Sequence, residues 1–158
     1  MKKETVCAAL LVTGVFYTAI VCAGDVGFPD QYRNWYHHHT TVNQEGHAPA
    51  GNVGIQHVYA NDLAVEGLKT GAYRDGSMFV VDRFNILPGE NNTLNQGDRK
   101  VVAVMLRDAA NNADTGGWAF AAFKGGDPAM QVVKDANACF ACHIPHADNS
   151  YLFTRGLR

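Results

Sequence analysis

Two cysteines and a histidine near the C-terminal end have the spacing that most clearly indicates chemistry in this sequence. Cys139 and Cys142 are separated by two residues, and His143 follows directly. This spacing is typical of covalent haem attachment, because each thiol can add to one of two neighbouring vinyl groups of a porphyrin. The histidine can then give a ring nitrogen to iron as the proximal ligand. The motif therefore predicts a haem c bound through Cys139 and Cys142.

Three other interpretations of the same residues are weaker. A structural zinc site would need a fourth ligand, and the sequence has no second Cys-x-x-Cys pair to supply it. A thioredoxin-like redox pair is expected early in a βαβ unit, whereas this motif lies near the C-terminus. A disulfide between the two cysteines would leave the following histidine without a role.

The first 23 residues have the pattern of a secretory signal peptide. Two lysines stand near the start, an apolar run covers 6–21, and Ala23 closes a short stretch suited to cleavage. We therefore expect a signal peptide over 1–23 and a single domain over 24–158. The apolar run is short for a membrane anchor, so we expect an exported, periplasmic protein without a stable membrane anchor.

Charge and cysteine content narrow the function further. The net charge is −2, and no basic cluster indicates a nucleic-acid partner. Cys7 and Cys22 lie in the expected signal, so the mature chain keeps only the two cysteines of the motif and has no disulfide framework. Covalent haem attachment and export are mutually consistent.

Hydrophobic periodicity and turn residues predict a mixture of strands and short helices. The expected elements are a helix over 29–38, a strand over 55–59, a helix over 61–69, strands over 78–86, 100–107 and 117–123, and a helix that begins at Asp127 and Pro128 and runs to Cys139. A long polar loop is expected over 87–99. This order predicts an α+β fold in which helices pack on an antiparallel sheet.

Three consecutive histidines, 37–39, fall at the end of the first expected helix. Successive side chains of a helix point about 100° apart, so three adjacent histidines cannot easily share one metal ion. The sequence therefore does not favour a metal site there.

Short segments spread over the mature chain resemble the cytochromes P-460 and their relatives, the cytochromes c′-beta. They are Tyr32-Arg33-Asn34-Trp35, Ile55-Gln56-His57-Val58-Tyr59, Lys69-Thr70-Gly71-Ala72-Tyr73-Arg74-Asp75-Gly76, Arg107-Asp108, Gly117-Trp118-Ala119-Phe120, the haem motif, and Tyr151-Leu152-Phe153-Thr154. The resemblance implies an exported homodimer of antiparallel sheet with a c-type haem and His143 as the proximal ligand.

Two positions depart from the P-460 pattern. The P-460 enzymes oxidise hydroxylamine and carry a lysine cross-linked to the haem, and this lysine aligns with Val81. A family arginine on the distal side aligns with Gln56. The c′-beta relatives lack the cross-link, have an apolar distal pocket and bind nitric oxide. The resemblance thus implies a nitric oxide-binding cytochrome whose distal pocket is lined by Phe79 and Val81, which share one face of an expected strand.

The residues are also compatible with two further functions. Met105 could fill the sixth iron position and make the protein a His/Met-ligated electron carrier with an unknown redox partner, although core packing explains this residue as well. Met78 is expected to point away from Phe79 and Val81. Alternatively, the protein is an oxidoreductase acting on hydroxylamine or small nitrogen oxides, with His57 as the nearest candidate acid–base group.

Overall fold

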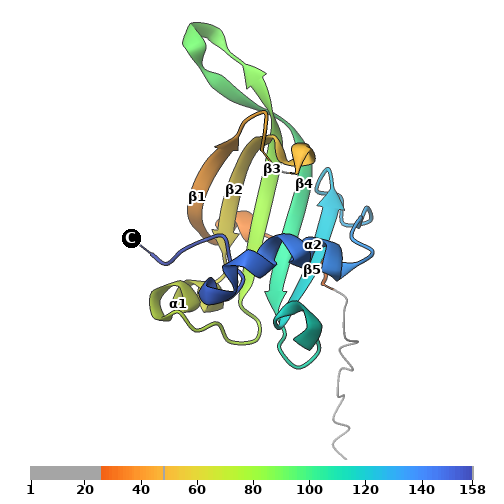
Figure 1. Cartoon of the computed structure of the whole chain (residues 1–158). Coiled ribbons are helices and arrows are strands. Elements are labelled where there is room, and N and C mark those ends of the chain that lie inside the picture. Colours follow the sequence, from red (N-terminus) through yellow and green to blue (C-terminus); the bar gives the residue numbers. More distant parts are fainter. Residues whose placement is uncertain (1–25, 48, 158) are drawn as a thin grey trace, which may run out of the picture.

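Five β-strands form one antiparallel sheet in which each strand pairs with the next along the chain (Figure 1). The computed structural model describes residues 26–47 and 49–157, so the expected signal peptide over 1–23 lies outside the described residues. The strands are β1 (Tyr36–Asn43), β2 (Gly54–Ala60), β3 (Met78–Pro88), β4 (Leu94–Arg107) and β5 (Trp118–Lys124). The expected α+β fold with an antiparallel sheet is confirmed.

Two α-helices and five short 3-10 helices connect and flank the strands in the described part of the chain. The helices are η1 (Tyr32–Asn34), η2 (Ala50–Asn52), α1 (Asp62–Thr70), η3 (Glu90–Asn92), η4 (Ala113–Thr115), α2 (Ala136–His143) and η5 (Ile144–Asn149). In α1 the Asn61 side chain accepts a hydrogen bond from the Ala64 amide at 2.9 Å, and Gly71, with φ 78°, ends the helix. No helix in the described residues is long and apolar enough to cross a membrane.

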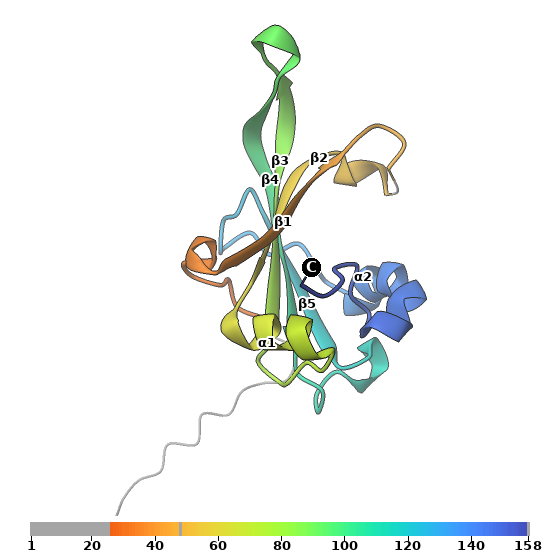
Figure 2. The ribbon, with the colours of Figure 1, turned by 90° about the vertical axis from the view of Figure 1, so that its left-hand side faces the viewer.

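Alternation along the strands gives the sheet two apolar faces. One face carries Phe79, Met105 and Phe120, and it packs against α1, α2 and the C-terminal segment. We call this the helix face. The other face carries Val80 and Val102 and packs against the N-terminal segment that includes η1. Figure 2, which shows the sheet edge-on, places α2 on one side and η1 on the other.

A buried carboxylate anchors the face opposite the helices. Asp82 of β3 is fully buried and accepts a hydrogen bond from the Tyr32 hydroxyl at 2.7 Å. Arg33 and Arg99 form ion pairs with it at 2.7 and 2.8 Å. Two cations and a hydroxyl thus compensate the charge that burial would otherwise penalise. Because Asp82 is fixed on this face, its strand neighbours Val81 and Arg83 are directed to the helix face.

The first predicted helix, over 29–38, is wrong. Only Tyr32–Asn34 is helical there, and β1 follows at once and contains all three consecutive histidines. The aromatic spacing that indicated a helix has another origin, because Tyr32 and Trp35 pack on the sheet face opposite the helices. The register of β1 shifts between His37 and His39, so a β-bulge interrupts the strand at His38.

The predicted polar loop over 87–99 is also wrong in most of its length. β3 continues to Pro88 and β4 begins at Leu94, so the two strands form a hairpin that projects beyond the rest of the sheet (green in Figure 1). Both sides of this ribbon are largely exposed, which leaves no apolar alternation to reveal it. Backbone pairing, such as that of Ile86 with Gln96, maintains the strands instead.

The helix predicted to begin at Asp127 is absent from the described residues. The Asp127 carboxylate accepts a hydrogen bond from the Ala129 amide at 2.9 Å, which closes a local turn. The Val132 amide then donates to the Ala122 carbonyl at 2.8 Å, so this segment runs back along β5. The helix that carries the cysteines starts later, at Ala136, with Asp135 as its N-cap.

Candidate haem site

Helix α2 presents Cys139, Cys142 and His143 on one side of its surface. They occupy positions i, i+3 and i+4, which are neighbours on the surface of a helix. Asp135 caps the helix by accepting a hydrogen bond from the Asn137 amide at 2.9 Å. Cys139 is half-buried against the core of the helix face, whereas Cys142 is exposed. Both thiols are free, so the donor set fits covalent attachment of a porphyrin.

The environment of Cys139 does not favour a thiolate. Burial raises the pKa of its thiol, and the neighbouring Cys142 and Asp135 charges raise it further. Reactive redox cysteines depend on a lowered thiol pKa. The local electrostatics therefore disfavour a thioredoxin-like role for Cys139.

The tautomer of His143 is set by a backbone acceptor. Its Nδ1 lies 2.7 Å from the Tyr151 carbonyl oxygen, and because a carbonyl can only accept, the proton is on Nδ1. Burial lowers the pKa of His143, which keeps the ring neutral. Nε2 therefore carries a lone pair, and it has no hydrogen-bond partner among the described residues. A metal-binding histidine with its other nitrogen tied to a carbonyl has this arrangement.

The segment that supplies the carbonyl is held in an uncommon conformation. Ser150 and Tyr151 have φ values of 54° and 63°, in the left-handed region that non-glycine residues rarely adopt. The Trp118 indole donates to the Ser150 carbonyl at 3.0 Å, and Asn149 donates to the Leu152 and Thr154 carbonyls at 2.6 and 2.8 Å. These bonds fix the Tyr151 carbonyl beside His143.

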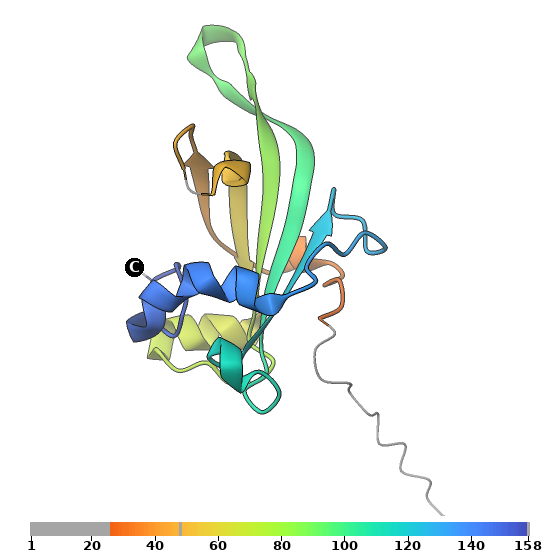
Figure 3. The ribbon, with the colours of Figure 1, turned by 45° about the vertical axis from the view of Figure 1, so that its right-hand side comes forward.

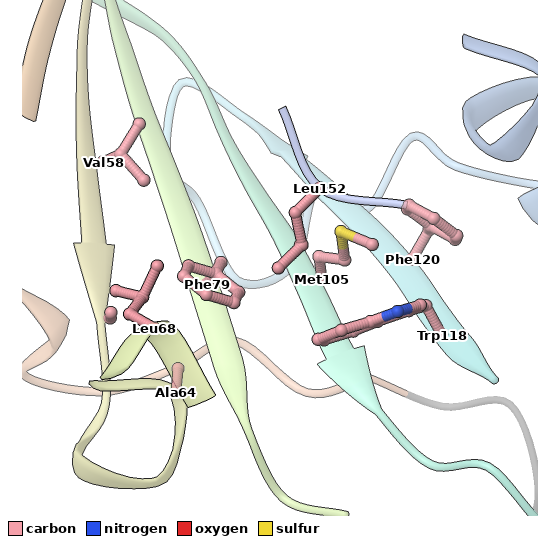
Figure 4. Packing of buried hydrophobic residues seen from close by; sticks show 9 residues of the cluster. Val58, Ala64, Leu68, Phe79, Met105, Trp118, Phe120 and Leu152 are labelled. Atoms are coloured by element: carbon pink, nitrogen blue, oxygen red, sulfur yellow. The ribbon is translucent and has the colours of Figure 1, made fainter. Parts of the chain in front are cut away.

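The helix face beside α2 is apolar at Val81. This residue pairs with Val58 of β2 and Ala103 of β4, and both Val81 and Ala103 are half-buried. Phe79 shares the face but is only 4 % exposed and lies in the packed layer shown in Figure 4. Its ring is 5.8 Å from that of Tyr73. Val81 is thus the accessible apolar side chain, and Phe79 forms part of the packed layer next to it.

Met105 lies on the same face but in the packed part of it. It pairs with Phe79 on one side and Phe120 on the other and is 7 % exposed. Figure 4 shows its sulfur near Leu152 and Phe120. Met78 packs on the opposite face, as its alternation with Phe79 predicts.

A polar cluster follows Val81 along β3. Arg83 and Gln56 are partners in the β2–β3 register, and the Arg83 Nη2 donates to the Gln56 side-chain oxygen at 2.8 Å. The Arg83 Nη1 donates to the side-chain oxygen of Asn52 in η2. Burial lowers the pKa of Arg83. The helix face is therefore apolar near α2 and cationic near η2.

The consecutive histidines are divided between the two faces of the sheet, because His39 pairs with Val58 of the helix face whereas His37 pairs with Tyr59 of the other face. His57 lies on the face opposite α2, where its ring nitrogens bond to Thr40 at 2.7 Å and Gln96 at 2.8 Å. Among the described residues there is no cluster of three or more His, Cys, Asp or Glu side chains that could hold a metal ion.

Sequence reasoning did not identify two features of this site. The Tyr151 carbonyl is a backbone atom, so no residue type announces it. Arg83 could be placed on the face of Val81 from strand alternation, but its partners Gln56 and Asn52 come from β2 and η2. Only the register of β2 against β3 brings them together.

An antiparallel sheet facing a helix with a Cys-x-x-Cys-His sequence is consistent with a c-type cytochrome. The family model for cytochrome P460 matches residues 29–154, so the chain belongs to the cytochrome P460 family. It is therefore a haem protein of the P460 and c′-beta kind, for which a covalently bound haem c is implied. No curated protein matches the chain.

Proposed function

We propose that this protein is an exported mono-haem c-type cytochrome that binds nitric oxide or a similar small gas. Cys139 and Cys142 attach the haem, and His143 is the proximal iron ligand. The observation that carries this proposal is the hydrogen bond from His143 Nδ1 to the Tyr151 carbonyl, which leaves Nε2 for a metal. When bound, the haem iron supplies the open coordination position at which a gas binds.

The apolar character of Val81 and its strand neighbours supports gas binding. Val58, Val81 and Ala103 lie side by side across three strands and offer no hydrogen-bond donor. These three side chains themselves give no stabilisation to a polar adduct. Neutral nitric oxide needs no donor, whereas bound dioxygen is helped by one. Because valine occupies the position of the family lysine, we also propose that the haem carries no lysine cross-link.

The rival functions have less support. Ligation by Met105 would require its removal from a packed layer with Phe120 and Leu152. Acid–base catalysis on hydroxylamine by His57 would require a side chain that lies on the other face of the sheet. We therefore favour gas binding over electron transfer and over hydroxylamine oxidation.

A nitric oxide titration of the ferrous holoprotein tests the proposal. We expect tight binding of nitric oxide with a change in the Soret band, and weak binding of cyanide to the ferric form. Val81→Gln adds a donor at similar size and is expected to strengthen cyanide binding, while Val81→Leu, which enlarges the side chain without adding a donor, is the control. A ferrous spectrum that does not respond to nitric oxide would contradict the proposal.

We further propose a homodimer, as the family resemblance implies, and export, as residues 1–23 indicate. Sedimentation of the holoprotein is expected to give twice the mass of one chain. N-terminal sequencing of periplasmic protein is expected to begin at Gly24.

A further inference from the structure

Arg83 is a half-buried cation on the helix face. Its alternation with Val81 directs it to the side of the sheet on which α2 lies. A guanidinium has five N–H donors. Three of them are engaged, two by the Gln56 side-chain oxygen and one by that of Asn52, which leaves two for another partner.

The acceptors around Arg83 are all neutral. No described carboxylate forms an ion pair with it, whereas Arg33 and Arg99 share the buried Asp82. Apart from Asp82, whose carboxylate lies on the other face of the sheet, the carboxylates nearest in sequence to this corner (Glu45, Glu90 and Asp98) are exposed.

Lys100 is a second cation in this part of the sheet. Its partner is likewise neutral, because its Nζ donates to the Val53 carbonyl at 2.7 Å. A desolvated cation with neutral partners only is costly unless an anion completes its surroundings.

The position of Arg83 matches the place expected for the propionates of a covalently bound haem. A porphyrin attached through its vinyl groups carries its two propionates on the opposite edge of the ring. Cys139 and Val81 pack against the same core cluster, and Arg83 lies two residues beyond Val81 along β3, next to η2. Figure 3 shows η2 and α2 at different heights on the same side of the strands.

We propose that Arg83 binds a haem propionate, with Gln56 and Asn52 as positioning residues that hold the guanidinium fork. The inference rests on the haem-attachment part of the proposed function and not on the identity of the gas. A propionate is a permanent anion of the holoprotein and compensates Arg83 at all times. An anion bound at iron is transient and would leave this cation uncompensated whenever it departs. The planar fork of arginine is also suited to a carboxylate.

The reduction potential as a function of pH tests this assignment. The titratable and charged groups near Arg83 are Lys100 and, from β1, His39, which pairs with Val58 on the same face. Both are unchanged in the Arg83→Gln variant and in Arg74→Gln, a control that removes the same charge from an exposed turn. Arg83→Lys keeps the charge without the fork. Haem content by pyridine haemochrome is measured first for each protein.

In Arg83→Gln we expect the apparent pKa of one propionate to rise by about one unit or more, seen as a new pH-dependent segment of the potential. Arg74→Gln is expected to match the native curve, and cyanide affinity is expected to change less than about twofold in both variants. A loss of about tenfold or more in cyanide affinity without a new ionisation would overturn the proposal and assign Arg83 to the iron ligand. An unchanged curve with unchanged affinity would also overturn it.

A crystal structure of the native holoprotein gives a second measurement that does not depend on any variant maturing. We expect an Arg83 nitrogen within about 3.2 Å of a propionate oxygen. A guanidinium that contacts only Gln56 and Asn52 in that structure would overturn the assignment. If nitric oxide does not bind, the pH dependence of the reduction potential and the crystal contact can still be measured. The gas-binding proposal and the Arg83–propionate proposal can therefore fail independently.

Discussion

The Nδ1–H of His143 donates to the Tyr151 carbonyl oxygen across 2.7 Å, and this contact links the haem motif to the segment that follows it. A hydrogen bond from the far nitrogen of a metal-binding histidine raises the basicity of the ligand. A more basic ligand favours ferric over ferrous iron. The C-terminal segment is therefore expected to tune the iron as well as to cover the core.

Asn149→Ala tests this link, because the Asn149 amide holds the Leu152 and Thr154 carbonyls. We expect a loss of about 1–3 kcal/mol in the free energy of unfolding and a rise in the reduction potential as the His143 bond loosens. Denaturant unfolding and potentiometry measure the two effects. Asn111→Ala, in an exposed loop, is the control, and equal potentials in both variants would argue against the link.

Alkaline pH is expected to destabilise the protein through Tyr32. Burial, with the Asp82 hydrogen bond and charge, raises the pKa of Tyr32 from 10.0 to about 12. A raised folded-state pKa means that the stabilisation is complete below pH 10 and is lost as the pH rises toward about 12. Between these values the unfolded chain ionises while the native chain stays protonated.

Tyr32→Phe removes the hydroxyl that Asp82 accepts from. We expect a loss of about 1–3 kcal/mol in stability at neutral pH and a weaker fall of stability above pH 10 than in the native protein. Thermal unfolding at several pH values measures both. Tyr36→Phe, at an exposed tyrosine, is expected to change neither, and an unaltered alkaline transition in Tyr32→Phe would contradict the mechanism.

Phe79 and Val81 are expected to differ although they share a strand face. Phe79→Ala opens a cavity beside Tyr73 and Trp118 and is expected to cost about 3–5 kcal/mol of stability. It also enlarges the pocket and speeds ligand access. Val81→Ala is expected to cost less and to raise the nitric oxide association rate, measured by flash photolysis. Val80→Ala on the opposite face is the control for a general loosening of the sheet.

Met105→Ala distinguishes the gas-binding function from electron transfer. Because Met105 is packed between Phe79 and Phe120, we expect a loss of about 2–5 kcal/mol in stability without a change in the ferric absorption spectrum. The weak ferric band that marks a methionine-ligated haem is expected in neither protein. Its presence in the native protein and disappearance in the variant would assign Met105 as the sixth ligand.

Much of the fold could be predicted where side-chain pattern and backbone agree. β2, α1 and β5 have clear alternation, capping residues or turns at their ends. Their expected bounds are therefore close to the observed ones. The predictions failed where the pattern had a different cause. The aromatic spacing of 29–38 reflects packing on a sheet face, and the β3–β4 hairpin has polar residues on both sides.

The candidate site likewise has a part that the sequence predicts and a part that only the structure shows. The Cys139, Cys142 and His143 spacing carries its own chemical meaning, and strand alternation placed Phe79, Val81 and Arg83 on one face. The contacts that complete the site depend on long-range register and on backbone conformation. The Arg83 partners follow from the pairing of β2 with β3, and the Tyr151 carbonyl is directed by two residues with positive φ.

The intact mass of the mature protein, made with haem-maturation machinery, tests the central claim most directly. We predict the mass of the chain plus one haem, loss of that addition in a Cys139→Ser, Cys142→Ser double variant, and an ordinary c-type pyridine haemochrome. A native protein at the mass of the chain alone under these conditions, or a haem that remains attached in the double variant, would contradict the account.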